Sequence, residues 1–245
     1  MKEKRSAERL TIMYRPTLLL LCIVFFAGVA APQQPAHKLV QFQMAIVRKG
    51  PNWKNDKSVY VPPLHQHIDY VNSLITSGKV VMAGLSGDTL ASGIIDVVIF
   101  RTSSADEAKG WANEDPALKA GFVVNEMHPW WSEDIFKPAS TPLTLRPVFL
   151  VFLKKGPNRK EGDDKDPEIQ ELQKAHIANI QRLAGEHKLA VAGPFGDDGE
   201  LRGIFILRVK RYEEARDLCA TDPMVKVGRL VAELHPWDVF EGMIP

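Results

Sequence analysis

The feature that most constrains this chain is an internal duplication. Six short motifs recur in the same order, at an offset that stays between 106 and 109 residues. The pairs are Lys49-Gly50-Pro51-Asn52 with Lys155-Gly156-Pro157-Asn158, His67 with His176, Ala83-Gly84 with Ala192-Gly193, Gly87-Asp88 with Gly196-Asp197, Asp115-Pro116 with Asp222-Pro223, and His128-Pro129-Trp130 with His235-Pro236-Trp237. Such self-similarity predicts one supersecondary unit that is formed twice.

Length and charge narrow the class of protein. The 245 residues accommodate two modules of ordinary domain size. We expect domains at 40–137 and 146–241, with linkers at 32–39 and 138–145. The formal net charge is +1, so no global field attracts a polyanion, and we expect no nucleic-acid partner.

The N-terminus predicts export. Five basic side chains before position 16 precede an almost wholly apolar run from Leu18 to Ala31. This run is shorter than the roughly 20 residues that a membrane-spanning helix needs. We therefore expect a signal peptide over residues 1–31 and a secreted or periplasmic protein. The alternative is an uncleaved membrane anchor, which is the only membrane contact that we expect.

The cysteine content predicts a fold without disulfides. Cys22 lies in the expected signal peptide, which leaves Cys219 without a partner. Apolar neighbours make Cys219 a candidate for a buried helix cysteine.

Hydrophobic periodicity predicts the order of elements in each copy. Val40 to Val47 alternates with period two, which is typical of a strand. In the second copy a helix opens at Pro167 and carries an apolar stripe that includes His176. In the first copy Pro62-Pro63 is expected to open the matching helix. Two further strands, a second helix and a closing strand follow in each copy, so the order is β-α-β-β-α-β twice.

This order predicts an α+β fold of two ferredoxin-like βαββαβ modules, packed sheet-to-sheet as an intramolecular pseudo-dimer. The closing strands alternate, so one face of each points into the space between the sheets. The polar residues expected on that face are Glu126, His128, Glu233 and His235, together with Gln41 and Gln43 from the opening strand. These residues predict a polar cleft between the sheets.

The second copy resembles the YciI-like (YCII-related) family. The residues that carry the resemblance are His176, Lys188–Pro194, Asp197-Asp198-Gly199, Asp222-Pro223, Gly228 and His235-Pro236-Trp237. The first copy departs, with Leu85 in place of the proline and a hairpin loop lengthened by Ala91-Ser92-Gly93. The resemblance covers residues 40–135 and 146–240.

The resemblance implies a fold and, less specifically, a chemistry. Family members pair into a dimeric α+β barrel, and a histidine with a nearby aspartate has been suggested as an acid–base pair. One relative eliminates chloride from a chlorinated hydroxyquinol, and most members have no assigned reaction.

The candidate catalytic residues are His176 with Asp197 and, in the first copy, His67 with Asp88. Histidine titrates near neutral pH, and an aspartate can orient its imidazole and stabilise the imidazolium. The alternative is that the histidines are hydrogen-bonded core residues and the aspartates are turn residues.

Other polar residues have simpler interpretations. Asp115 and Asp222 precede prolines, as helix N-caps do. His-Pro-Trp is interpreted as a strand terminator with a packing tryptophan, or alternatively as a cleft wall. Loop lysines could hold an anionic substrate, although solvated lysines are more common. These lysines are Lys49, Lys54, Lys155 and Lys160.

The chain carries no phosphate loop, dinucleotide fingerprint, nucleophile elbow or zinc-ligand spacing, so we expect neither a cofactor nor a metal. Three functions remain. The first is a lyase-like acid–base enzyme acting on a small hydroxylated or aromatic substrate. The second is a module that binds a small ligand without turnover, and the third is a structural domain used in assembly. Association into a higher homo-oligomer stays open.

Overall fold

The computed structural model describes residues 38–140 and 144–244, and residues 37–245 form one compact unit. The predicted signal peptide and most of the first predicted linker lie outside the described residues. No helix within the described part of the chain is long and apolar enough to cross a membrane.

The first repeat contains four strands and four helices. Its elements are β1 (Leu39–Lys49), α1 (Lys57–Thr76), β2 (Val80–Ser86), α2 (Thr89–Ser92), β3 (Ile94–Phe100), α3 (Ala105–Ala112), α4 (Pro116–Lys119) and β4 (Val123–Glu133). The predicted strand and helix order is therefore confirmed. The residues that lengthen the hairpin loop contribute to the short helix α2.

The second repeat follows the same plan. Its elements are β5 (Leu145–Lys155), the 3-10 turn η1 (Asp163–Lys165), α5 (Pro167–Gly185), β6 (Leu189–Pro194), β7 (Leu201–Leu207), α6 (Tyr212–Cys219), α7 (Pro223–Lys226) and β8 (Leu230–Phe240). Pro167 opens α5 as predicted, behind the N-cap Asp166. The closing strands β4 and β8 run on through His-Pro-Trp, so this motif does not terminate them.

The predicted start of α1 is wrong. The helix begins at Lys57, and Pro62 and Pro63 lie inside it. The Asp56 side chain caps the helix by accepting hydrogen bonds from the backbone N–H and the hydroxyl of Ser58, at 2.9 and 2.7 Å. This cap starts the helix before the prolines, which then fall in its second turn.

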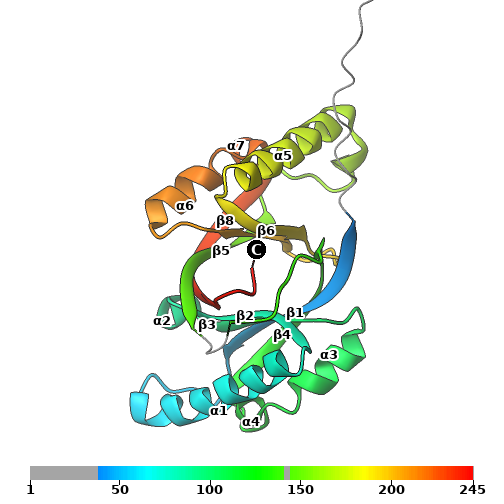
Figure 1. Ribbon diagram of the computed structural model, residues 1–245. Helices are drawn as coiled ribbons and strands as arrows, with labels where there is room; N and C mark the ends of the chain where they lie inside the picture. The colour runs from blue at the N-terminus through cyan, green and yellow to red at the C-terminus, as the bar shows by residue number, and fades with distance from the viewer. Residues whose placement is uncertain (1–37, 141–143, 245) are drawn as a thin grey trace, which may run out of the picture. The chain divides into compact units, whose positions relative to one another are not determined.

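The eight strands form a single curled antiparallel sheet in the order β4-β1-β3-β2-β8-β5-β7-β6. The fold is therefore mixed α+β. The helices of both repeats cover the outer face of the curled sheet, with α1, α3 and α4 below it and α5, α6 and α7 above it in Figure 1. The prediction of sheet-to-sheet packing did not include this edge pairing: both half-sheets line one apolar cluster, and their edge strands also join.

The repeats meet at two junctions. At the first, a bridge joins Trp130 of β4 to Phe195 after β6. At the second, β2 pairs with β8 over three residues, Gly84 to Ser86. Matching backbone hydrogen bonds run from Gly87 N to the Pro236 carbonyl oxygen, at 2.8 Å, and from Gly196 N to that of Pro129, at 2.7 Å.

The duplicated motifs contact each other across these junctions. The Trp130 indole N–H donates to the carbonyl oxygen of Gly193, at 3.1 Å, and Trp237 donates to that of Gly84. A Cβ on Gly84 would lie 2.7 Å from the Trp237 ring, and one on Gly193 would lie 3.0 Å from Trp130. Both glycines leave room for the other repeat's tryptophan. The Ala-Gly and Pro-Trp motifs are thus two halves of one contact.

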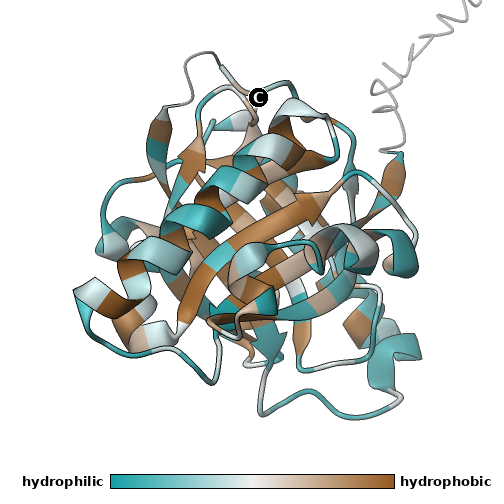
Figure 2. Ribbon diagram, turned by 90° about the horizontal axis from the view of Figure 1, so that it is seen from below, coloured by the Kyte–Doolittle hydropathy of each residue, from teal (hydrophilic) through white to brown (hydrophobic). Residues whose placement is uncertain are grey.

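The inner face of the sheet is filled by apolar side chains rather than by a polar cleft. Phe42, Met44 and Ile46 of β1 pack there against Trp130, Trp237 and their neighbours. Phe136 and Ile244 also join this cluster. Brown strands and partly teal helices in Figure 2 show the same distribution of hydropathy. The predicted polar cleft is therefore wrong.

Two further apolar clusters lie between the sheet and the helices of each repeat. Leu230, Ala232 and Leu234 of β8 belong to the second of these, as the alternation of the closing strand predicts. Gln43 was expected in the inter-sheet space, but its amide donates to the Ser103 carbonyl oxygen, at 2.9 Å, next to α3. It shares the helix-facing side of β1 with Ala45 and Val47, which pack in the first helix-facing cluster.

Candidate functional site

His176 lies on α5, with its side chain largely buried against the sheet. Its Nδ1 lies 2.7 Å from Oδ2 of Asp222, and its ring stacks on Phe205 at a centroid distance of 6.1 Å. Asp222 also caps α7 by accepting from the Met224 N–H, at 2.9 Å, so the predicted cap is confirmed. The predicted pairing of His176 with Asp197 is wrong, because the helix cap occupies the histidine.

His67 occupies the matching position on α1 but has two acidic partners. Its Nδ1 lies 2.6 Å from Asp115, the N-cap of α4, and its Nε2 lies 3.3 Å from Asp96 of β3. All three side chains are buried. Burial alone disfavours the charged imidazolium, but its hydrogen bonds to Asp115 and Asp96 outweigh burial and raise the pKa of His67 to about 9. His67 is therefore charged at neutral pH and cannot serve there as the predicted base.

The predicted aspartates bind other histidines, across the junctions. Asp197 lies 2.7 Å from Nδ1 of His128, whose Nε2 lies 3.0 Å from Glu126. We call Glu126, His128 and Asp197 the first junction cluster. Glu126 and His128, two of the four residues predicted to line a cleft, therefore lie at a junction, and the other two, Glu233 and His235, lie at the second one.

The second junction cluster repeats this arrangement with the roles of the repeats exchanged. Asp88 lies 3.0 Å from Nδ1 of His235, and Glu233 lies 3.0 Å from its Nε2. A basic residue completes each cluster, Arg48 beside Glu126 at 2.8 Å and Lys154 beside Glu233 at 2.9 Å. Aspartate orients an imidazole in this geometry, while the glutamate stays reachable. The side chain of Glu233 is 43% exposed, against 5% for His235.

The carboxylates of the second junction cluster are held in the ionised form. Burial disfavours the charge on Asp88, but hydrogen bonds from Ser86, His235 and Ser92 outweigh it and lower its pKa. Burial likewise opposes the charge on Glu233, and Lys154 and His235 together lower its pKa below the usual range. Because ionised carboxylates only accept, both contacts of His235 form together when both ring nitrogens carry hydrogen.

One open hollow adjoins this cluster. Its volume is about 470 Å³, within the range of small-molecule sites. The lining residues are Lys154, Lys155, Glu200, Tyr212, Val231, Ala232, Glu233 and Leu234. We call it the β8 hollow. It places Glu233 beside an aromatic ring, aliphatic side chains and two lysines.

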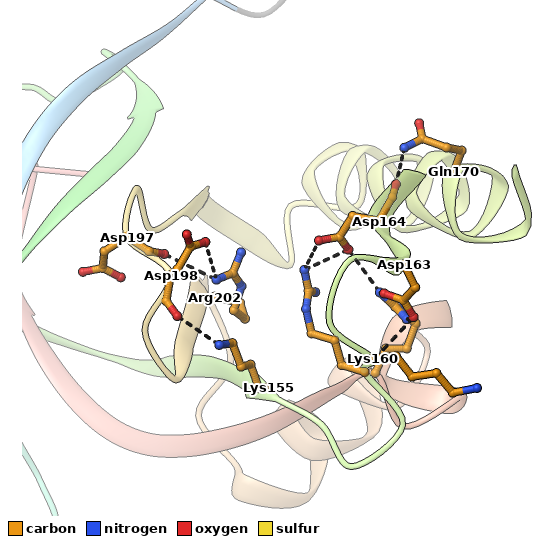
Figure 3. A network of polar contacts seen from close by, with 10 residues as sticks. Lys155, Lys160, Asp163, Asp164, Gln170, Asp197, Asp198 and Arg202 are labelled. Atoms are coloured by element: carbon orange, nitrogen blue, oxygen red, sulfur yellow. Dashed lines mark hydrogen bonds and ion pairs between the residues drawn. The ribbon is translucent and has the colours of Figure 1, made fainter. Parts of the chain in front are cut away.

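The loop lysines have separate environments. Lys155 lines the β8 hollow and donates to the Asp198 carbonyl oxygen, at 2.9 Å, as Figure 3 shows. Lys49 lies over the ring of Trp53, at 5.7 Å from its centroid. Lys54 and Lys160 do not line the hollow. Among residues 38–140 and 144–244, no group of three or more His, Cys, Asp or Glu side chains could hold a metal ion.

The sequence analysis missed three residues that shape these sites. Asp96 holds His67, yet the second repeat has Gly203 at that place, so the duplication gives no signal for it. Tyr212 and Glu200 line the hollow, while Ala105 and Gly93 stand at the matching places of the first repeat. A search for shared motifs finds none of these residues, because each is specific to one repeat.

No family model matches the chain, and no curated protein matches it in sequence. Several solved structures resemble it in fold, including the following two. A chlorite dismutase variant from Candidatus Nitrospira defluvii gives a TM-score of 0.52 at 11% identity, over 82% of this chain and 92% of that one. A proposed monooxygenase from Fusobacterium nucleatum gives a TM-score of 0.51 at 14% identity, over 84% and 97%. The chain thus shares with these proteins a mixed α+β fold with a curled antiparallel sheet, and the likeness concerns the fold alone.

Proposed function

We propose that this protein binds a small organic molecule in the β8 hollow and transfers a proton on it through Glu233. The observation that carries the proposal is that Glu233 lines the hollow and also contacts His235, which contacts Asp88. Glu233 is the member of this cluster that a bound molecule reaches, because it is the more exposed. The names of the two structural neighbours, which denote enzymes of small molecules, agree with this class of function.

The lowered pKa of Glu233 determines which chemistry fits. An ionised glutamate accepts a proton, but one with a low pKa is a weak base. It therefore suits a substrate whose proton is about as acidic as that of a carboxylic acid. His235 and Lys154 fix the orientation of the carboxylate, and Asp88 fixes that of the imidazole.

A ligand screen by thermal shift tests this proposal. A compound that binds the folded protein raises its melting temperature by mass action. Tyr212→Ala and Glu233→Gln should abolish the shift. Glu126→Gln is the matched control, since it alters the equivalent residue of the first repeat, which does not line the hollow. An equal loss in Glu126→Gln, or no shift with a broad panel of metabolites, overturns the proposal.

A second candidate is that the junction clusters serve assembly only. It rests on their reciprocity, since each joins a strand of one repeat to a hairpin of the other. In that case Asp88→Asn and Asp197→Asn destabilise the protein to the same extent. Neither variant then changes the affinity for any compound from the screen.

We also propose that the chain is the single-chain counterpart of a ferredoxin-like homodimer of the YciI type. Support comes from the order β4-β1-β3-β2, which the second repeat copies as β8-β5-β7-β6, and from the reciprocal junctions. Further association is tested by light scattering at several protein concentrations. The proposed export is tested by N-terminal sequencing of protein from cell fractions, with a mature end near residue 32 as the expected result.

A further inference from the structure

We infer that the molecule bound in the β8 hollow is a small zwitterion, with a carboxylate and an ammonium group on a short apolar body. This inference rests on the proposed function, whose site it specifies. The hollow combines charges of both signs with an apolar wall, and each part of that combination has a chemical counterpart in such a ligand.

The charges in the lining are balanced. Two ammonium groups, of Lys154 and Lys155, face two carboxylates, of Glu200 and Glu233. Because Lys154 and Glu233 pair with each other, a simple anion on Lys155 would leave Glu200 without an opposite charge, and a simple cation on Glu200 would leave Lys155 without one. A zwitterion offers one group to each sign, so it matches the lining without changing its net charge.

Two of the four charged groups remain available. Lys154 and Glu233 bind each other at 2.9 Å. Lys155 donates one of its three N–H groups to the Asp198 carbonyl oxygen (Figure 3), so the other two remain available. The Glu200 carboxylate forms no hydrogen bond or ion pair among the described residues, although its charge acts on Lys154 through space and adds to the effect of Glu233 in raising the pKa of that ammonium group. A ligand carboxylate therefore fits Lys155, and a ligand ammonium fits Glu200.

These two groups are neighbours. The backbone N–H of Lys155 donates to the Glu200 carbonyl oxygen, at 2.9 Å, where β5 ends beside the start of β7. Their side chains consequently start from adjacent points of the sheet. The close spacing suits a ligand that carries its two charges on adjacent carbons, as an α-amino acid does.

The apolar residues that line the hollow indicate the chemical nature of the rest of the ligand. Tyr212 is 50% exposed and Val231 is 45% exposed, and both border the hollow with Ala232 and Leu234. Large apolar side chains at the surface of a site are typical of ligand contacts. An aromatic or branched aliphatic side chain of the ligand covers this wall. The first repeat has Ala105 and Gly93 in place of Tyr212 and Glu200, so we expect one ligand per chain.

Calorimetry with three matched probes tests the inference on the intact protein. L-phenylalanine carries both charges, 3-phenylpropanoate lacks the ammonium group, and 2-phenylethylamine lacks the carboxylate. We expect L-phenylalanine to bind about tenfold or more tightly than either analogue, since a hydrogen bond to a charged group is lost in each. The expected stoichiometry is one.

Two variants assign the groups. Glu200→Gln should reduce the affinity for L-phenylalanine to that of 3-phenylpropanoate and leave the latter unchanged. Lys155→Met should reduce the affinity for L-phenylalanine to that of 2-phenylethylamine and leave the affinity for 2-phenylethylamine unchanged. Glu213→Gln, on α6 next to Tyr212 but outside the lining, is the control and should leave all three affinities unchanged.

The outcomes separate this inference from the proposed function. If 3-phenylpropanoate binds as tightly as L-phenylalanine, the zwitterion is wrong and a binding site for organic anions remains. If 2-phenylethylamine matches L-phenylalanine, the site is one for organic cations. If none of the three probes binds but the metabolite screen finds another ligand lost in Tyr212→Ala, the inference fails alone. If neither experiment finds a ligand, both fail.

Discussion

The two repeats use the same helix histidine in different ways. His67 sits between Asp96 and Asp115, as a buried cation between two carboxylates. His176 has only Asp222, since Gly203 replaces the second aspartate, and its ring stacks on Phe205, where the first repeat has Val98. A cavity of about 10 Å³ lies beside His67, and Val98 is one of the residues that line it.

The junctions show the opposite behaviour. Each repeat supplies the same glycine, aspartate, histidine and tryptophan, and each contact occurs twice. A residue at a junction contacts residues of the other repeat, so a substitution there disturbs a surface that both repeats share. Residues inside a helix–sheet layer contact only their own repeat and can diverge independently. The residues that hold the repeats together are therefore the same in both repeats, whereas the residues of each helix–sheet layer can differ.

Removing the helix histidines should give the largest difference between the repeats. His67→Ala leaves two buried carboxylates without a cation, and we expect a loss of about 3–5 kcal/mol in the free energy of unfolding. His176→Ala leaves one such carboxylate, which Asn179 also contacts at 3.4 Å, so we expect roughly 2–3 kcal/mol. Urea denaturation measures both. Equal losses would contradict the different environments proposed for the two histidines.

The charge on His67 should make stability fall at alkaline pH. Its folded-state pKa of about 9 lies above the ordinary value of 6.5, so its stabilisation is complete below pH 6.5 and is lost as the pH rises through 9. The shift corresponds to on the order of 3 kcal/mol. The free energy of unfolding, measured from pH 6 to 10, should show this decline. Asp96→Asn should reduce it, and a pH profile unchanged by that substitution would rule out the charged pair.

Adding a methyl group at the junction glycines should destabilise both junctions. A Cβ on Gly84 would lie 2.5 Å from the Asp238 carbonyl oxygen, and one on Gly193 would overlap the Trp131 carbonyl oxygen. We expect Gly84→Ala and Gly193→Ala to lose about 1–3 kcal/mol each. Gly110→Ala, in helix α3 with nothing near its Cβ, is the control and should gain about 0.5–1 kcal/mol. The idea of tight junctions fails if Gly193→Ala unfolds at the same urea concentration as the unsubstituted protein.

The smallest effect concerns the ends of the long helices. Gly78 follows α1 with φ of +74°, and His187 stands at the matching place after α5 with φ of +57°. A side chain is strained in this left-handed region. We expect His187→Gly to stabilise the protein by roughly 0.5 kcal/mol or more, and Gly78→Ala to destabilise it. Thermal unfolding measures the pair, and a loss in His187→Gly would show that the histidine side chain has a stabilising contact.

Much of the fold follows from local patterns. Alternation in Val40–Val47 and the apolar stripe around His176 specify a strand and a helix, because only neighbouring residues are needed to define a period. Asp115-Pro116 and Asp222-Pro223 specify helix starts through capping, which involves residues two positions apart. The start of α1 was predicted wrongly because a proline pair and the cap at Asp56 are both local start signals, and the helix begins at the cap.

The candidate site was predicted less well. The sequence identified the histidines and aspartates through the duplication, but it paired them wrongly. The true partners lie 46 residues apart for His176 and 147 residues apart for His235. Spacing along the chain carries no information about such contacts, since the first depends on how two helices of one repeat pack together and the second on how the edges of the two half-sheets meet.

The sequence by itself determined that one β-α-β-β-α-β unit occurs twice, because its elements depend on local periodicity and on turn and cap residues. Only the tertiary structure decided that the two units share one curled sheet with an apolar interior, since the two half-sheets join edge to edge and Phe136 and Ile244 pack with both inside. It also decided that the Ala-Gly, Gly-Asp and His-Pro-Trp motifs form the junctions. The residues that distinguish the β8 hollow occur in one repeat only, so the duplication that opens the sequence could not identify them.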